Sequence, residues 1–184
     1  MTQLTMIIEQ DRSELDQIIN LISNSDFSNV IELTNNIDVP LEQLEPYMFW
    51  DDKAYTRNCV ARGENFELLV LCWDKGQGTA IHCHDDQECW VKVVEGSFSE
   101  TMYSFDEDTS VLKRLSTAHL EKNETTSVED QNLYHTLNNT SEGRGATLHL
   151  YMNPINKCTV YYKTKNCFEE KNLRYHSIEG NLCL

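Results

Sequence analysis

The 184-residue sequence lacks the features that mark membrane and secreted proteins. No apolar run approaches the roughly 18 residues that a helix needs to span a bilayer. The opening stretch, MTQLTMIIEQDRSE, has neither a basic region nor a sustained apolar core, so we expect no signal peptide. The seven cysteines are scattered and odd in number, which indicates free thiols in a reducing compartment. We therefore expect a soluble, cytoplasmic protein.

Basic residues are also scarce, since 15 Lys and Arg stand against 30 Asp and Glu and give a formal net charge of -15 at pH 7. A surface of this kind repels phosphate backbones and anionic lipids, so we expect neither a nucleic acid nor a membrane as a partner. The same charge, without a long apolar edge, favours a monomer.

Helical patterns are confined to the first quarter of the chain. Apolar residues recur at helical spacing from about Met6 to Glu45, and Pro40 and Pro46 interrupt any longer helix. From Phe66 onward the period becomes two, in short runs such as FELLVLCW, ECWVKVVEG, FSETMYSF and ATLHLYM. Clusters of Gly, Asp, Asn and Ser separate these runs.

Many short strands without helices between them are typical of an antiparallel β-barrel or jelly roll. The sequence also contains no internal repeat. We therefore expect a mainly β protein with a single domain over residues 1–184. Residues 1–46 would form two or three short helices packed outside a barrel made by residues 47–184.

The stretch GQGTAIHCHDDQECWVKVVEG places His82 and His84 one residue apart. Side chains alternate between the two faces of a strand, so these histidines point the same way. Further along, Cys89 and Lys92 fall on opposite faces, and an isolated buried charge is costly inside a small barrel. We therefore expect Cys89 to face the interior and Glu88 to point outward.

The two histidines are a candidate metal pair, because their imidazoles can converge on one ion. Two ordinary polar residues at the start of a strand would give the same H-x-H pattern. The surroundings favour the metal. Gly76 and Gly96 flank the stretch, and a third histidine, His135, is followed four residues later by Asn139.

This arrangement resembles the two sequence motifs of cupins. The first motif is G-x5-H-x-H, followed later by a metal-ligand position and, after six further residues, a glycine. The second motif is H-x3-N. In that register Cys89 occupies the position that a metal-binding glutamate usually holds. A cysteine at this position makes the chain similar to the cysteine dioxygenases of the eukaryotic type, and the resemblance covers roughly residues 47–162. Further matching stretches are AYTRN at 54–58, LVLCW at 69–73, GSFSET at 96–101 and TLHLYMNP at 147–154.

The resemblance implies a non-haem iron enzyme. It implies that His82, His84 and His135 hold Fe(II), and that L-cysteine reacts with O2 to give cysteine sulfinic acid, a step on the thiol oxidation ladder. Three neutral imidazoles without a carboxylate leave a divalent ion its full charge and, in a six-coordinate complex, three open positions. The donor set alone does not choose the metal, because imidazole suits Fe, Zn, Cu and Ni.

Arg57 is the candidate substrate anchor. A guanidinium matches a carboxylate in two hydrogen bonds, and the resemblance places the arginine of the YTRN stretch on the carboxylate of the amino acid. Tyr55 has the same parity and would add a hydroxyl to the same pocket. A surface arginine paired with an acidic residue is the alternative in a chain this acidic.

Thr147, His149 and Tyr151 share one face of a strand by the period of two. Such alternation usually means that the polar side chains point to solvent. The resemblance instead places this row inside the barrel, with Tyr151 beside the substrate and the other two orienting it. It also implies a thioether cross-link between Cys89 and Tyr151, so that these two and His149 are the candidate catalytic residues. The family usually has Ser-Pro after this tyrosine; here Met-Asn-Pro follows, so the turn is trans, shifted or strained.

Other functions remain compatible with the sequence. One is a dioxygenase for a different small thiol, cysteamine or 3-mercaptopropionate. Another is a cupin isomerase or hydrolase that uses Zn or Mn with Glu88 as a fourth ligand. The last is a small-molecule or storage cupin without catalytic activity.

Overall fold

The computed structural model of the chain separates into two compact units, Met1–Pro46 and Tyr47–Leu184. It describes residues 13–24, 38–84, 87–128 and 133–183. Residues 25–37, which belong to the predicted helical segment, lie outside the described residues. Among the helices that are described, none is both long and apolar enough to cross a bilayer.

The N-terminal unit contains two short α-helices in its described part, as the helical spacing predicts. The first, α2 (Glu14–Ser23), begins after Ser13, whose hydroxyl accepts a hydrogen bond from a backbone N–H of the first turn. This cap satisfies one of the N–H groups that a helix start leaves free. The second, α4 (Leu41–Leu44), continues into a 3-10 turn, η1 (Glu45–Tyr47).

The C-terminal unit is built from strands arranged in two sheets. Their bounds are β1 (Thr56–Arg62), β2 (Glu67–Trp73), β3 (Ile81–His82), β4 (Cys89–Glu95), β5 (Phe98–Asp106), β6 (Val111–Leu120), β7 (Thr125–Val128), β8 (Leu133–Asn139), β9 (Gly145–Tyr151), β10 (Lys157–Tyr162), β11 (Cys167–Asn172), β12 (Ser177–Ile178) and β13 (Asn181–Leu182). One sheet has the order β13-β12-β1-β2-β9-β4-β7, and the other has the order β11-β10-β3-β8-β5-β6. The described pairings are antiparallel except that of β1 with β12, which is parallel.

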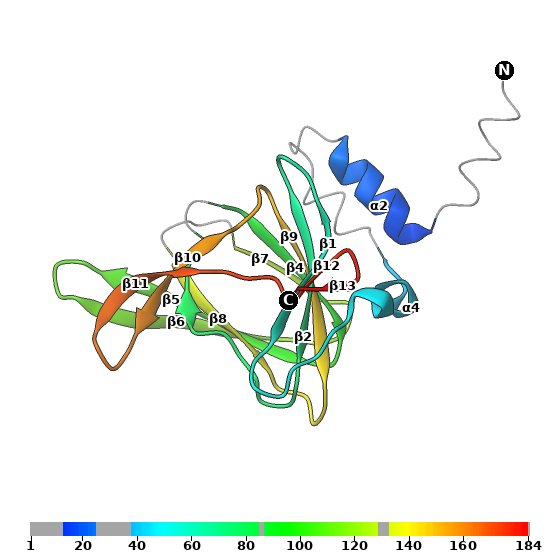
Figure 1. Ribbon diagram of the computed structural model, residues 1–184. Helices are drawn as coiled ribbons and strands as arrows, with labels where there is room; N and C mark the ends of the chain where they lie inside the picture. The colour runs from blue at the N-terminus through cyan, green and yellow to red at the C-terminus, as the bar shows by residue number, and fades with distance from the viewer. Residues whose placement is uncertain (1–12, 25–37, 85–86, 129–132, 184) are drawn as a thin grey trace, which may run out of the picture. The chain divides into compact units, whose positions relative to one another are not determined.

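Side chains from both sheets meet in one core, so the sheets face each other as two layers of a barrel (Figure 1). This core includes Leu69 and Trp73 of β2, Val91 of β4, Phe98 of β5 and Leu137 of β8. The predicted mainly β fold is therefore confirmed, and among the described residues the short helices lie in the N-terminal part.

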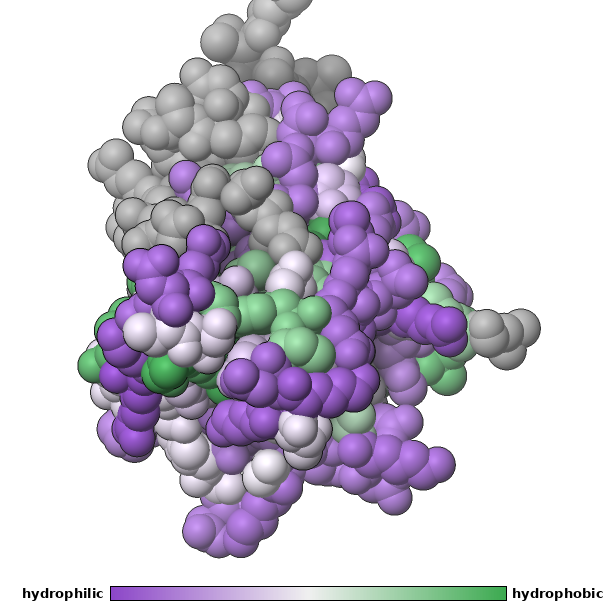
Figure 2. All heavy atoms as spheres, turned by 90° about the vertical axis from the view of Figure 1, so that its left-hand side faces the viewer, coloured by the Kyte–Doolittle hydropathy of each residue, from purple (hydrophilic) through white to green (hydrophobic). Residues whose placement is uncertain are grey.

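Two hairpins, β5–β6 and β10–β11, extend from the six-stranded sheet on the left of Figure 1. They touch each other, because the rings of Phe105 on β5 and Phe168 on β11 lie 4.7 Å apart. Figure 2 views the molecule from this side and shows mainly hydrophilic side chains with smaller apolar patches. Such a surface fits the acidic composition of the chain.

Strand β4 tests the predicted alternation of side chains. Cys89 belongs to the buried core, as predicted, and Glu88 is exposed. Lys92 lies on the opposite face from Cys89, yet only 7% of its surface is exposed. The alternation therefore predicts correctly which side chains of β4 face the barrel interior. It does not predict that side chains on the outer face of β4 are buried too.

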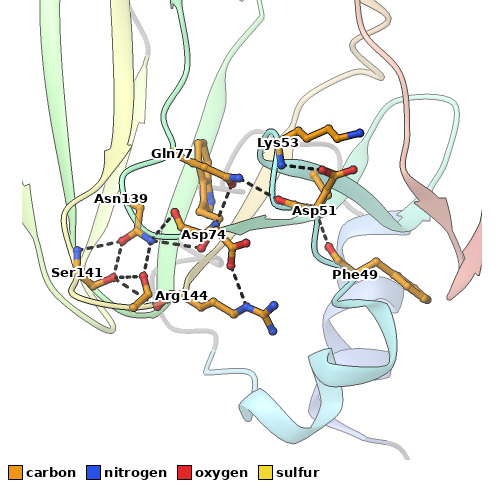
Figure 3. Close-up of polar contacts among 11 residues, drawn as sticks. Phe49, Asp51, Lys53, Asp74, Gln77, Asn139, Ser141 and Arg144 are labelled. Carbon is orange, nitrogen blue, oxygen red and sulfur yellow. Dashed lines mark hydrogen bonds and ion pairs between the residues drawn. The ribbon is translucent and has the colours of Figure 1, made fainter.

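Asn139, the last residue of β8, ties two chain segments together at one end of the barrel (Figure 3). Its Nδ2 donates hydrogen bonds to the carbonyl oxygens of Trp73 at 3.3 Å, Asp74 at 3.2 Å and Gly143 at 3.0 Å. Its Oδ1 accepts hydrogen bonds from the backbone N–H and the hydroxyl of Ser141. The asparagine of the H-x3-N motif, four residues after the motif histidine, thus joins the β8–β9 turn to the end of β2.

Replacing Asn139 with Ala should lower the free energy of unfolding by about 2–4 kcal/mol, because buried carbonyl and N–H groups lose their partner. Urea denaturation followed by circular dichroism measures the change. Asn138→Ala is the matched control, since this side chain makes one weak hydrogen bond, at 3.4 Å to Thr136. Equal stability of the two variants would contradict the anchoring role of Asn139.

Candidate metal centre

Three histidines converge from two strands and the loop that follows β3. His82 on β3 is paired directly with His135 on β8, and His84 follows two residues after His82. One ligand atom from each ring lies within 4.8 Å of the other two. The structure thus brings together the three residues predicted as metal ligands, and no further His, Cys, Asp or Glu joins this cluster among the described residues.

The nitrogens of the cluster have the orientation that a shared ion requires. Nδ1 of His82 lies 3.0 Å from the carbonyl oxygen of Ala80, and Nδ1 of His135 lies 2.8 Å from a carboxylate oxygen of Glu100. Both oxygens accept hydrogen bonds only, so both Nδ1 atoms carry a hydrogen and both Nε2 atoms keep a lone pair for a ligand.

The spacing also fits a single ion. Nε2 of His135 and Nε2 of His84 are 3.1 Å apart. Two imidazole nitrogens about 2.1 Å from a metal ion, at a right angle, would be about 3.0 Å apart. Nδ1 of His84 is a buried nitrogen without a hydrogen-bond partner among the described residues. The residues present therefore fit a divalent ion held by three imidazoles.

Burial keeps the imidazoles of His82 and His84 neutral, which is the form that binds a metal ion. Burial, followed by the nearby ring of His135, lowers the pKa of His82 to about 3. Burial, again followed by the neighbouring histidines, lowers the pKa of His84 well below its usual range.

Arg57, the predicted substrate anchor, lines the same pocket as the three histidines. It lies on β1 with 8% of its surface exposed, so the surface-arginine alternative is wrong. Its Nη2 lies 3.5 Å from a carboxylate oxygen of Glu67 and 3.5 Å from the carbonyl oxygen of Ile155. Its Nε is buried without a hydrogen-bond partner among the described residues, and is therefore available to a ligand.

The charge of Arg57 is maintained by its neighbours. Burial alone disfavours a charged guanidinium, but the nearby Tyr151 and Glu67 outweigh that cost, so the pKa of Arg57 is raised. Tyr55 also lines the pocket, as predicted, and its ring stacks on that of Trp73 at 4.4 Å.

Sequence analysis missed Glu67, the first residue of β2. Its side chain is fully buried, and it accepts hydrogen bonds from the backbone N–H of Ile155 at 3.3 Å and from the hydroxyl of Tyr175. The tyrosine links it to the C-terminal segment, whose backbone N–H at His176 donates to the carbonyl oxygen of Arg57 at 2.7 Å. Parity would have placed Glu67 inside, because it alternates in phase with the interior residues Leu69, Leu71 and Trp73 of β2.

The polar row of β9 faces the interior, where Thr147, His149 and Tyr151 are all buried. The hydroxyl of Thr147 accepts a hydrogen bond from Nε1 of Trp73 at 2.9 Å and forms a second hydrogen bond with Nε2 of His149 at 2.8 Å. Nδ1 of His149 lies 3.9 Å from Sγ of Cys89. Solvent exposure of this row, the usual meaning of such alternation, is wrong here.

Tyr151 and His149 both line the pocket, whereas Thr147 lies behind it. The ring of Tyr151 is 5.5 Å from that of His84, and the guanidinium of Arg57 lies 5.8 Å from its centre. Burial, then the neighbouring Cys89, raises the pKa of Tyr151 well above its usual value, so the phenol keeps its proton. The Met-Asn-Pro turn that follows has no cis peptide bond.

Cys89 stands directly opposite Tyr151 in the pairing of β4 with β9. Burial is the main reason that the pKa of its thiol is raised, so it stays protonated. It does not line the pocket and is not part of the histidine cluster. Glu88 is exposed and also outside the cluster, which removes the support for a fourth carboxylate ligand at that position.

Comparison with known proteins identifies sequences similar to this chain. Residues 3–164 match the family described as cysteine dioxygenase type I. The chain is 31% identical over 137 residues to cysteine dioxygenase type 1 of Rattus norvegicus, an alignment that covers 73% of this chain and 68% of the rat protein. It is 29% identical over 168 residues to cysteine dioxygenase type 1 of Danio rerio, covering 88% of this chain and 84% of that protein.

Comparison with solved structures finds likeness at low sequence identity. The crystal structure of TT1209 from Thermus thermophilus gives a TM-score of 0.50 with 14% identity, covering 60% of this chain and 93% of that one. The Cnp3 cupin domain of Schizosaccharomyces pombe gives a TM-score of 0.48 with 11% identity, covering 64% of this chain and 74% of that one. The sequence matches decide the family: the chain belongs to the cysteine dioxygenase type I family.

Proposed function

We propose that this protein is a thiol dioxygenase that uses Fe(II) and O2 to oxidise L-cysteine to cysteine sulfinic acid. The observation that carries this proposal is the convergence of three imidazoles and a buried, incompletely paired guanidinium in one pocket. When bound, Fe(II) supplies the activation of dioxygen and the transfer of both oxygen atoms to the thiol sulfur. Family membership supports this reaction over others that a three-histidine site could catalyse.

Arg57 and Tyr55 bind the amino acid in this proposal. The free Nε of Arg57 points to a ligand that accepts hydrogen bonds, and a carboxylate is the acceptor that matches a guanidinium best. Glu67 holds the guanidinium from its other side and so fixes its direction. The substrate is thereby oriented with its thiol toward the histidine cluster in the same pocket.

Tyr151, His149 and Thr147 form a row of buried polar side chains on β9, and the proposal places the reacting sulfur beside this row. The hydrogen bond between the hydroxyl of Thr147 and Nε2 of His149 fixes the orientation of this imidazole ring. The protonated phenol of Tyr151 can donate a hydrogen bond to the bound substrate or to an oxygen atom next to it. Polar side chains that are already held in place need little reorganisation during the reaction.

Oxygen uptake tests the reaction directly. Protein loaded with Fe(II) should consume O2 with L-cysteine and form the sulfinate, measured with an oxygen electrode and by mass spectrometry of the product. Cysteamine and 3-mercaptopropionate are the parallel substrates. Faster turnover of cysteamine than of L-cysteine would refute the role given to the carboxylate, and the absence of uptake with every thiol would refute the dioxygenase.

Replacing Arg57 with Gln should raise KM for L-cysteine about 10- to 150-fold, the equivalent of about 1.5–3 kcal/mol for a hydrogen bond to a charged group. Oxidation of cysteamine, which has no carboxylate, should change far less. Arg144→Gln is the matched control, because Arg144 pairs with Asp74 at the surface, outside the pocket. An equal loss with both thiols would show that Arg57 supports the fold and not substrate binding.

We further propose that Cys89 and Tyr151 become joined by a thioether bond during turnover. The thiol and the ring each lose one hydrogen, and O2 accepts the two electrons and two protons. The intact mass should therefore fall by two hydrogen atoms in a fraction of the molecules that have turned over.

The change should be absent in Cys89→Ser and present in Cys158→Ser, which removes a different cysteine that lines the pocket. Peptide mapping locates the cross-link. An unchanged intact mass of the parent protein after many turnovers would contradict this proposal.

A further inference from the structure

Glu100 is a buried carboxylate next to the histidine cluster that none of the roles above includes. It lies on β5 with 4% of its surface exposed. Its Oε1 accepts the hydrogen bond of 2.8 Å from Nδ1 of His135. Its Oε2 accepts a hydrogen bond of 2.6 Å from the hydroxyl of Thr126 on β7. Both oxygens therefore have a partner, and the side chain is held in one orientation.

The strands fix this arrangement. On β5, Glu100 alternates in phase with Phe98, a fully buried core residue, so its side chain points to the interior. In the pairing of β5 with β8, Glu100 stands opposite Leu137, and Met102 stands opposite His135. The carboxylate reaches diagonally across to the imidazole, as neighbours two residues out of register can.

The three imidazoles of the cluster consequently differ in the hydrogen-bond acceptor that their Nδ1 atoms meet. Nδ1 of His135 donates a hydrogen bond to the carboxylate of Glu100. Nδ1 of His82 donates one to the neutral carbonyl oxygen of Ala80 at 3.0 Å. Nδ1 of His84 has no hydrogen-bond partner among the described residues. A carboxylate behind an imidazole draws its N–H hydrogen away from the ring and makes the opposite nitrogen a stronger donor.

We propose that Glu100 is a positioning residue for the metal, and that its charge acts through His135 in place of a carboxylate ligand. This inference rests on the proposed three-histidine metal site. The donor set has no carboxylate of its own, because a cysteine stands at position 89 and Glu88 is exposed. Glu100 places a negative charge behind the imidazole of His135, on the side away from the metal. There it strengthens metal binding without occupying a coordination position that substrate and O2 need.

The charge also has a redox consequence. A nearby negative charge stabilises a trivalent ion more than a divalent one. Glu100 therefore lowers the Fe(III)/Fe(II) reduction potential relative to a site with three unsupported imidazoles.

Metal affinity of the full-length, metal-free protein tests this role without reference to catalysis. Zn(II) and Co(II) would each be titrated against a chelating dye. Glu100→Gln keeps an oxygen that can accept from His135 and an amide that can donate to Thr126, so it removes only the charge. We expect it to bind both ions about 10-fold more weakly, and Glu100→Ala about 10- to 100-fold more weakly.

Two variants serve as controls. Glu142→Gln removes a surface carboxylate that pairs with Lys75, outside the histidine cluster, and should leave metal affinity within a factor of two. Thr126→Val removes only the second hydrogen bond of Glu100, and should change metal affinity less than threefold. Urea denaturation of each metal-free variant separates weaker metal binding from a weaker fold.

The Fe(III)/Fe(II) potential gives an independent measurement, which a merely structural role for Glu100 would not move. It should rise in Glu100→Gln and stay unchanged in Glu142→Gln. Parent-like affinity and potential in Glu100→Gln would overturn this inference and leave the dioxygenase proposal standing. Failure of the parent protein itself to bind Zn(II) and Co(II) would overturn both.

Discussion

Burial of polar side chains inside the barrel is the constraint on which the whole site depends. Water does not satisfy these groups, so each needs a partner from the protein or from a ligand. Glutamates hold His135 and Arg57, and a threonine hydroxyl holds His149. Among the described residues, the buried nitrogens that remain without a partner belong to His84 and Arg57. Both side chains line the pocket in which a metal ion and a substrate would bind.

The alternation of side chains along a strand predicts much of this interior from the sequence. It depends only on local backbone geometry, so it correctly places Cys89 among the core residues. Which strands become neighbours depends on contacts far apart in the sequence. The direct pairing of His82 with His135 therefore could not be derived from either stretch alone. The resemblance to a known family supplied that long-range information.

The two buried glutamates show where reasoning from composition fails. In a chain with a net charge of -15, an acidic residue on a strand is readily assigned to the solvent face. The alternation that buries Leu69 and Phe98 buries Glu67 and Glu100 as well. Their positions were thus accessible from the sequence, but their partners were not, because the partners come from other strands and from the C-terminal segment.

The pairing of Arg57 with Glu67 bears on how substrate would be chosen. A guanidinium that already has a carboxylate 3.5 Å away is close to neutral as a pair, so it can stay buried when the pocket is empty. The same pairing weakens any general attraction of anions into the pocket. In the proposed reaction, the selection of an amino acid therefore depends on the direction of the free Nε more than on net charge. A thiol with a carboxylate would bind because the carboxylate fits the donors of Arg57 while the sulfur reaches the histidines. An anion that meets only one of these two conditions would bind weakly.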